Sequence, residues 1–433
     1  MIKRVLLALF LLIVVAVAAF VFWAQQPEIA AIAPPAARSF DPAVVARGAQ
    51  LAAIGNCNTC HTTEGGAPFA GGRALPTPFG TIYATNITPD PDTGIGRWSL
   101  AAFHRSLRAG VDRAGRHLYP AFPYDHFTKL DDDDIAALYA FLMTRDPVRA
   151  EAKHNDLPFP LDNRLVIAGW KLLFLRSGPY RNDPAHDEAW NRGAYLVTAV
   201  AHCGACHTPR NVLGAEQRSR YFGGGTAEGW HAPALNAASP APVRWTADAL
   251  FAYLRDGAHA DHGAAAGPMA PVTHNLARAP EADVRAIADY VAAVDNRPAE
   301  DARKATEAVT RAAPDGEAAQ MAAKADQVSA AIFTGACANC HADVRQGPSG
   351  AINLALTSSV NGPDPRNAIR VVLDGIHPPE GRRGPIMPSF AAALTDQQIA
   401  GLLAYVRARF SAQPAWSNLE EDVRRIRQGG EQG

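Results

Sequence analysis

No cysteine of this chain lies outside three copies of one five-residue pattern, Cys-x-x-Cys-His. The chain has six cysteines, so no thiol remains for an iron–sulfur cluster or a catalytic nucleophile. A zinc site would need a second pair of ligands and no obligatory histidine after the cysteines. Thioredoxin-like redox chemistry would need only one such motif, on a βαβ background. The copies comprise Cys57, Cys60 and His61; Cys203, Cys206 and His207; and Cys337, Cys340 and His341.

The same pattern supplies what covalent haem attachment requires. Its two thiols lie one helical turn apart and can form thioethers with the haem vinyl groups, while the adjacent imidazole binds the iron. Because every cysteine is used in this way, the sequence predicts three covalently bound c-type haems. The six cysteines are the predicted attachment points, and His61, His207 and His341 are predicted iron ligands.

Strong charge, nucleotide-binding loops and a second metal pattern are also missing. The formal net charge is -1, so there is no broad basic field for nucleic acid. No G-x-G-x-x-G follows a strand and no Walker loop is present, which argues against a dehydrogenase site in the chain itself. His259 and His262 fall in an Ala/Gly loop and are expected to be solvated. Two functions stay open for the chain on its own: a peroxidase-like haem enzyme that works at an open first haem, and a free multihaem electron carrier.

The N-terminus carries one long apolar run. Lys3 and Arg4 precede it, and it extends from Val5 to Trp23. About 19 residues are enough to span a bilayer core, and the basic flank keeps the N-terminus cytoplasmic. A cleaved signal peptide is the rival interpretation, because residues 16–18 resemble a cleavage site. The run continues well past that site, which favours a retained anchor. Haem is attached outside the cytoplasm, so the body is expected on the periplasmic side of the inner membrane.

The spacing of the motifs divides the rest of the chain into three similar units. In each, a helix carries the haem motif, a Gly/Pro-rich loop follows, and an apolar-periodic helix closes the unit. Strand patterns are nearly absent, so the expected fold is all-α, with three tandem cytochrome c domains behind the membrane helix. Residues 295–326 are expected to form a polar helical connector that acts as a spacer. The expected boundaries are 1–26 for the anchor, 40–150, 186–297 and 320–412 for the domains, and 413–433 for a C-terminal tail.

Helix boundaries can be predicted from caps and periodicity. The closing helices are expected over residues 132–144, 281–294 and 396–410. Thr395 and Gln398 form a predicted capping box at the start of the last one. A further helix in the first unit is expected to begin at Ser99 and to stop at Gly110, a residue that suits a C-terminal cap.

The sixth iron ligand sets the haem potential, and methionine raises it. The chain has only five methionines. Met269 and Met387 each stand between prolines on a loop before a closing helix, at corresponding places in the second and third units. The flanking prolines favour an extended loop that would hold a thioether against the iron. Both methionines are therefore predicted axial ligands.

The first unit departs from this pattern. Phe122 stands where a methionine is expected, and a phenylalanine cannot bind iron. His126 lies four residues further on and is the favoured sixth ligand. His117, His104, Met143 and an open coordination site remain open as candidates.

Several runs resemble the three-haem cytochrome c subunits of membrane-bound bacterial dehydrogenases. They are TPFGTIYATNITPD at residues 77–90, TGIGRWS at 93–99, GWHAP at 229–233 and MPSF at 387–390. Alcohol dehydrogenase members of this family usually read Pro-Ala-Met-Pro in the first unit. The Pro-Ala-Phe-Pro found here is similar to cytochrome subunits paired with molybdenum hydroxylases that act on aldehydes or N-heteroaromatics.

The resemblance implies an electron-transfer subunit of a periplasmic dehydrogenase complex, with no substrate-oxidising site of its own. Its implied partner is a dehydrogenase catalytic subunit. A molybdenum hydroxylase with an iron–sulfur subunit is favoured, and a quinone-cofactor dehydrogenase comes second. Electrons would pass through the haems to membrane quinone or a terminal oxidase.

Overall fold

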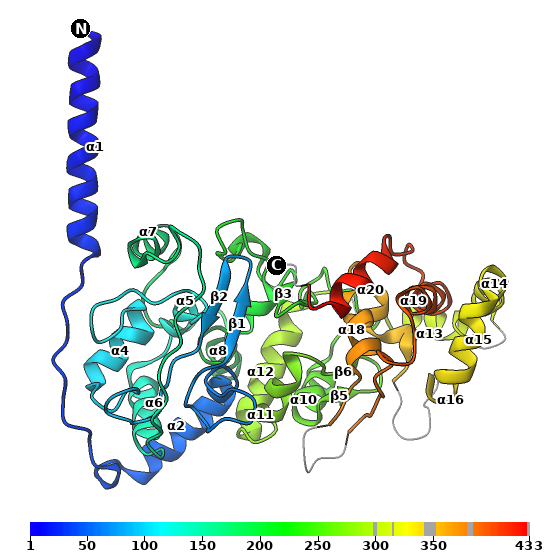
Figure 1. Cartoon of the computed structure of the whole chain (residues 1–433). Coiled ribbons are helices and arrows are strands. Elements are labelled where there is room, and N and C mark those ends of the chain that lie inside the picture. The colour runs from blue at the N-terminus through cyan, green and yellow to red at the C-terminus, as the bar shows by residue number, and fades with distance from the viewer. Residues whose placement is uncertain (298–300, 314–315, 342–351, 379–383, 431–433) are drawn as a thin grey trace. The chain divides into compact units, whose positions relative to one another are not determined.

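The computed structural model describes residues 1–297, 301–313, 316–341, 352–378 and 384–430 (Figure 1). The chain divides into two compact units, Met1–Asn182 and Asp183–Gly433. Helices dominate both units. The strands of the described residues form three two-stranded antiparallel sheets. The expected helix-rich fold with an apolar N-terminal helix is confirmed.

Helix α1 (Ile2–Ala24) opens the first unit. Its apolar side chains are exposed along most of its length, and only Ala24 is buried. Of the helices in the described part of the chain, α1 alone is long and apolar enough to cross a membrane, with a mean hydropathy of 3.3. Length and composition therefore agree with the predicted anchor.

The body of the first unit is built on the crossing of α2 and α6. Gly48 makes this crossing close, because a Cβ placed on it would lie 2.0 Å from the carbonyl oxygen of Ala137. The elements after α1 are η1 (Ala37–Ser39), α2 (Pro42–Ile54), α3 (Cys57–Cys60), β1 (Ala74–Thr77), β2 (Gly80–Tyr83), α4 (Leu100–Ala109), α5 (Tyr124–Phe127), α6 (Asp132–Met143) and α7 (Arg164–Phe174).

The predicted helices of this unit are confirmed. The Ser99 side chain accepts a hydrogen bond from Ala102 N at the start of α4, and Gly110 ends that helix with a φ of 60°. Helix α6 ends at Met143, one residue before the expected boundary, and its apolar stripe is buried. Helix α7 was not predicted from the sequence.

The second unit begins with a similar helix crossing, between α8 and α12. A Cβ on Gly193 would lie 2.1 Å from the carbonyl oxygen of Ala286, so these helices also meet at a glycine. The elements up to α12 are α8 (Glu188–Tyr195), the π-helical η2 (Leu196–Val200), α9 (Gly204–His207), η3 (Arg218–Arg220), β3 (Gly225–Ala227), β4 (Trp230–Ala232), α10 (Ala247–Asp256), β5 (Ala258–His259), β6 (Gly263–Ala264), α11 (Met269–Leu276) and α12 (Glu281–Val294).

The remaining helices of this unit pack around α19. The Thr395–Gln398 capping box at its start is present as predicted. The elements are α13 (Asp301–Arg311), α14 (Glu317–Ala325), α15 (Gln327–Ala336), α16 (Ala338–His341), η4 (Leu354–Leu356), α17 (Ser358–Asn361), α18 (Arg366–Asp374), α19 (Asp396–Phe410) and α20 (Leu419–Arg427).

Two segments that the sequence marked as peripheral contribute to this core. Ala312 and Ala322, from the expected spacer, are buried in one cluster with Leu402 and Phe410 of α19. The expected tail contains α20, whose Val423 is buried with residues of α18 and α19. The connector therefore packs against α19, the closing helix of the third unit. Its interpretation as a simple spacer was wrong.

Strand β4 is tied to helix α18 by a two-way side-chain contact. Asn367 donates its amide to the carbonyl oxygen of His231 at 2.7 Å and accepts a hydrogen bond from the His231 backbone nitrogen at 2.9 Å. Arg370, one turn further along α18, donates to the carbonyl oxygen of Gly229 at 2.9 Å. These bonds join a strand that follows the second haem motif to a helix that follows the third.

Candidate haem sites

Each Cys-x-x-Cys-His motif coincides with a four-residue helix: α3, α9 or α16. No disulfide joins any of the six cysteines, all of which belong to the described residues. Burial raises the pKa of Cys57 to about 12, and the neighbouring Cys60 adds to the effect. Burial likewise raises the pKa of Cys203 to about 12. At these two sites burial therefore favours the thiol over the thiolate.

The three motif histidines share one arrangement. In each, Nδ1 lies within hydrogen-bond distance of a backbone carbonyl oxygen. The distances are 2.7 Å from His61 to Thr85, 2.7 Å from His207 to Pro233, and 3.1 Å from His341 to Ile352. A carbonyl oxygen can only accept, so Nδ1 carries the proton in all three rings.

This tautomer leaves Nε2 as the nitrogen whose lone pair can bind a metal. Burial is the main cause that lowers the pKa of His61, His207 and His341, which keeps the rings neutral. A neutral imidazole whose Nδ1 is held by a carbonyl is the usual form of a metal-binding histidine. Two cysteines for attachment beside an oriented imidazole that can bind the iron fit a covalently attached haem.

The first two sites are built by the same backbone contacts. Gly71 donates its N–H to the carbonyl oxygen of His61 at 2.8 Å, and Gly224 does the same to His207 at 2.8 Å. A hairpin then follows in each case, β1–β2 or β3–β4, and leads to the carbonyl that holds the imidazole. Gly71 has a φ of 79° and Gly224 a φ of 88°, values that favour glycine.

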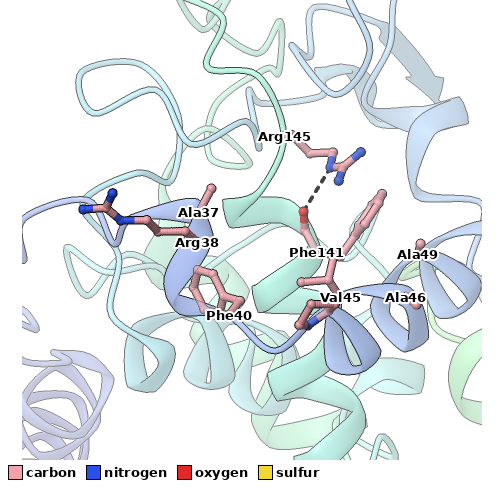
Figure 2. A pocket seen from close by; sticks show the side chains of 9 residues that line it. Ala37, Arg38, Phe40, Val45, Ala46, Ala49, Phe141 and Arg145 are labelled. Carbon is pink, nitrogen blue, oxygen red and sulfur yellow. Dashed lines mark hydrogen bonds between the residues drawn. The ribbon is translucent and has the colours of Figure 1, made fainter.

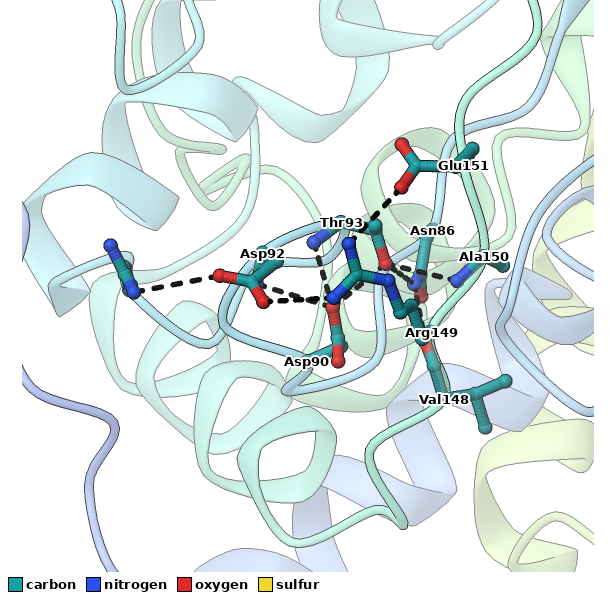
Figure 3. Close-up of polar contacts among 9 residues, drawn as sticks. Asn86, Asp90, Asp92, Thr93, Val148, Arg149, Ala150 and Glu151 are labelled. Carbon is teal, nitrogen blue, oxygen red and sulfur yellow. Dashed lines mark hydrogen bonds and ion pairs between the residues drawn. The ribbon is translucent and has the colours of Figure 1, made fainter.

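The signature run after Thr85 fixes that carbonyl in place (Figure 3). Asn86 is buried and donates to the carbonyl oxygen of Val148 at 2.7 Å and to the Thr93 hydroxyl at 3.0 Å. Thr93 in turn donates from its backbone N–H and its hydroxyl to Asp90, at 2.7 Å and 2.8 Å, and these bonds lower the pKa of Asp90. The run therefore locks the loop that orients His61.

The distal loops of the first two sites can be compared through their hydrogen bonds. Leu118 N donates to the carbonyl oxygen of Gly110 at 2.8 Å, and Ala265 N donates to that of Gly257 at 2.8 Å. Both glycines end the preceding helix, α4 or α10, in the left-handed conformation. The two loops therefore start from equivalent positions.

Four residues beyond these positions stand Phe122 and Met269. Phe122 N donates to the carbonyl oxygen of Tyr119 at 3.1 Å, and Met269 N donates to that of Ala266 at 3.2 Å. Phe122 in the first loop is therefore equivalent in backbone position to Met269 in the second loop. Met269 is half-buried and is the first residue of α11, so the extended conformation expected there was wrong.

Met387 has the extended backbone that the sequence indicated. Its N–H and C=O both pair with Ile376, each at 2.9 Å. The side chain is partly buried against the cluster formed by α18, α19 and α20. Met387 is therefore held by an antiparallel bridge to Ile376, next to the closing helix α19.

Every candidate ligand of the first site is buried or contacts other protein groups. His126 is buried in α5, and Phe122 packs against Phe127 with the ring centroids 5.2 Å apart. His117 is engaged at both ring nitrogens, with Nε2 2.8 Å from the carbonyl oxygen of Ala24 and Nδ1 3.0 Å from Lys171 Nζ. Iron binding by His117 through either ring nitrogen would displace the contact that this nitrogen now makes, which argues against it.

His104 and Met143 are also held by neighbouring protein groups. His104 Nε2 lies 2.9 Å from an Asp132 carboxylate oxygen. Met143 is 3% exposed, inside the stripe of α6. Iron binding by either residue would require it to leave these contacts.

In the second unit, the expectation that His262 is solvated was wrong. The side chain is buried and stacked on Trp245 with the ring centroids 3.6 Å apart. Burial lowers its pKa to about 3. His262 is therefore a neutral packing residue in this fold.

A hollow near the start of α2 does not resemble a catalytic site (Figure 2). Small and aromatic side chains line it, and Arg145 donates to the carbonyl oxygen of Phe141 at 3.1 Å beside it. The described residues that line it include no histidine, cysteine, methionine or carboxylate; they are Ala37, Arg38, Phe40, Pro42, Val45, Ala46, Ala49, Phe141 and Arg145.

Comparison with known families agrees with this geometry. Residues 45–146 match the family described as Cytochrome c, and residues 324–406 match Cytochrome C oxidase, cbb3-type, subunit III. The protein is a c-type cytochrome with covalently attached haem.

Two relatives narrow the class of cytochrome to which the chain belongs. The chain is 36% identical over 408 residues to the fructose dehydrogenase cytochrome subunit of Gluconobacter japonicus, covering 90% of this chain and 83% of that one. It is 33% identical over 411 residues to the cytochrome c subunit of alcohol dehydrogenase (quinone) from Gluconobacter oxydans, covering 91% and 84%. The chain therefore belongs to the family of dehydrogenase cytochrome c subunits.

A further relative is longer than this chain. It is a nicotinate dehydrogenase subunit of Pseudomonas putida, 47% identical over 407 residues. The match covers 93% of this chain and 33% of that protein. The chain thus spans about a third of that relative's length.

Proposed function

We propose that this protein is the electron-transfer subunit of a periplasmic dehydrogenase complex and that it carries three covalent haems. The repeated histidine geometry is the observation that supports this most directly, because three separate imidazoles are held in the metal-binding tautomer beside three cysteine pairs. Each haem supplies a one-electron redox centre. The chain's own contribution is to orient the ligands and exclude water.

The proposed domains follow the three motifs. They are cytochrome c domains over residues 40–150, 186–297 and 320–412. The equivalent hydrogen bonds of the first two sites support the repeat, and so do the helix crossings at Gly48 and Gly193. Packing of α14 and α20 onto α19 indicates that the third domain also uses neighbouring segments.

The proposed axial ligands differ between sites. Met269 and Met387 supply thioethers to the second and third haems, and His126 supplies an imidazole to the first. The burial of His126 and the occupation of His117 by Ala24 and Lys171 support this choice. A bis-histidine haem has a lower potential than a histidine–methionine haem, so the first haem should have the lowest potential of the three.

The proposed partner is a dehydrogenase catalytic subunit. A molybdenum hydroxylase with an iron–sulfur subunit is favoured, because the relative with 47% identity is named a nicotinate dehydrogenase subunit and nicotinate is an N-heteroaromatic. A quinone-cofactor dehydrogenase is second, on the likeness to the quinone alcohol dehydrogenase subunit. Helix α1 would hold the chain on the periplasmic face of the inner membrane, and electrons would leave to membrane quinone or a terminal oxidase.

Purification of the full chain with its associated subunits tests both parts of this proposal. Molybdenum and non-haem iron in the complex would identify the favoured partner, while a bound quinone cofactor without molybdenum would identify the second. A complex that contains neither, or a chain that purifies alone under mild detergent, contradicts the role as a complex subunit.

The haem number is tested separately. A pyridine haemochrome assay should give three haems per matured polypeptide. Changing both Cys203 and Cys206 to Ala should remove one haem and leave the other two, because each motif attaches its own. A wild-type value below three would refute the proposed number.

A further inference from the structure

Helix α7 buries a lysine on its inner side and exposes apolar side chains on its outer side. Ile167, Ala168 and Lys171 are buried, while Leu172 and Leu173 are exposed. A surface helix normally turns its charged side chains to water and its apolar stripe to the core. Here a lysine points inward and leucines point outward.

The inward lysine is well satisfied. Lys171 Nζ donates to the carbonyl oxygen of Ala109 at 2.9 Å and to that of Gly110, and lies 3.0 Å from His117 Nδ1. Ala109 and Gly110 form the end of α4, where the carbonyl oxygens and the helix dipole interact favourably with a cation. Arg164, on the same side of α7, donates to the carbonyl oxygen of His117 at 2.6 Å. These contacts fix the rotation of α7, so Leu172 and Leu173 stay on its outer side.

The outward side of α7 exposes several apolar side chains. Val166 is 38% exposed, Leu172 56% and Leu173 63%, and Phe159, just before the helix, is 84% exposed. Gly169 lies on the same side. Isolated exposed apolar residues are common, but a cluster on one short helix marks a surface that meets another apolar phase.

The position of this helix identifies that phase. Helix α7 packs against α1, and a Cβ on Gly169 would lie 3.7 Å from Phe20 Cζ. The carbonyl oxygen of Ala24, the last residue of α1, lies 2.8 Å from His117, which also contacts Lys171. The exposed face of α7 is therefore continuous with the end of the helix proposed to span the membrane.

We propose that α7 lies in the interface of the bilayer that α1 crosses, with Val166, Leu172 and Leu173 inserted among the lipid chains. An interfacial helix buries its apolar face at the headgroup boundary and keeps its polar contacts on the other side. In α7 the protein body supplies those polar contacts. The first haem domain would then rest on the membrane at two places. This inference depends on the proposed membrane anchor.

Photocrosslinking of the full chain in vesicles of phosphatidylethanolamine and phosphatidylglycerol tests the inference. The photoreactive residue p-benzoylphenylalanine is introduced at Leu173, at Leu12 of α1, and at Leu100, which is exposed at the start of α4. Lipid adducts are expected from positions 12 and 173 and not from position 100. A second probe is placed at Leu172, where lipid adducts are also expected. It replaces the Leu173 probe if that variant carries fewer haems than wild type.

The outcomes separate the inference from the anchor proposal. Lipid adducts from position 12 without adducts from positions 172 and 173 overturn the inference and leave the anchor intact. Absence of adducts from positions 12, 172 and 173 overturns both. In the purified complex, crosslinking of position 173 to a catalytic subunit would assign this face to a protein interface and overturn the inference.

Discussion

Replacement of Gly193 by alanine should destabilise the second unit although alanine is the better helix former. The added Cβ would lie 2.1 Å from the carbonyl oxygen of Ala286 and 2.8 Å from the Cβ of Tyr290. Carbon and oxygen atoms normally stay about 3.3 Å apart, so α8 and α12 would have to separate by about 1 Å. The obstacle is backbone, which cannot rotate away.

The magnitude follows from two opposing effects. Alanine gains about 1 kcal/mol of helix propensity over glycine. Overpacking costs about 1–3 kcal/mol or more, and a contact with a rigid backbone oxygen belongs at the upper end. The expected net loss is therefore about 2 kcal/mol, which lowers Tm by about 6 °C in a unit of this size.

Gly335 provides the matched control. It lies in α15 of the same unit, and a Cβ on it would meet nothing within 4 Å. Gly335→Ala should be neutral or stabilising by up to about 1 kcal/mol. Thermal unfolding of both variants is followed by Soret absorbance at equal haem content. If Gly193→Ala melts at or above the wild-type temperature, the argument that the helices meet at this glycine is refuted.

Three further predictions concern single side chains. Met387→Leu should remove one sulfur-to-iron charge-transfer band in the near infrared and lower one haem potential. Met321→Leu, at an exposed methionine of the connector, is the control and should change neither. Identical spectra for the two variants would contradict ligation by Met387. His126→Ala should convert one haem to high spin and allow carbon monoxide to bind the reduced protein, and Phe122→Met should raise one potential; three low-spin haems without carbon monoxide binding would place the ligand elsewhere. Burial lowers the pKa of Lys171 to about 7 from 10.5, so between these pH values the unfolded chain holds a proton that the folded chain has lost, and stability should rise with pH. Relative to Lys171→Met, the wild-type unfolding free energy should gain up to about 2 kcal/mol from about pH 7 to about pH 9, and parallel pH profiles would disprove the shift.

Elements with local signals could be predicted closely from the sequence. Helix α12 begins and ends at the expected residues, and so does α19, because periodic apolar residues lie within each helix and α19 also has its capping box. The end of α4 at Gly110 follows from the same kind of local chemistry. The motif cysteines and histidines were equally evident.

Features that depend on distant contacts were missed. Helix α7 lacked a recognisable pattern because its inward lysine is stabilised by carbonyls of α4, far away in the sequence. His262 is buried in a stack with Trp245, which is a contact between separate segments. The carbonyls that hold the motif histidines belong to Thr85, Pro233 and Ile352, and a backbone oxygen leaves no signature in residue type. The equivalence of Phe122 and Met269, by contrast, was correctly indicated by loop spacing.

The bond pair between Asn367 and His231 bears on the timing of electron movement. His231 is two residues before Pro233, whose carbonyl orients His207, while Asn367 lies on α18, whose end leads to the segment of Met387. The tunnelling rate between two redox centres falls exponentially with the gap between them, so it is uniform only where that gap does not fluctuate. If the proposed second and third haems occupy these sites, this contact would hold the supports of both at a fixed separation, and we expect the rate of transfer between them to be insensitive to solvent viscosity.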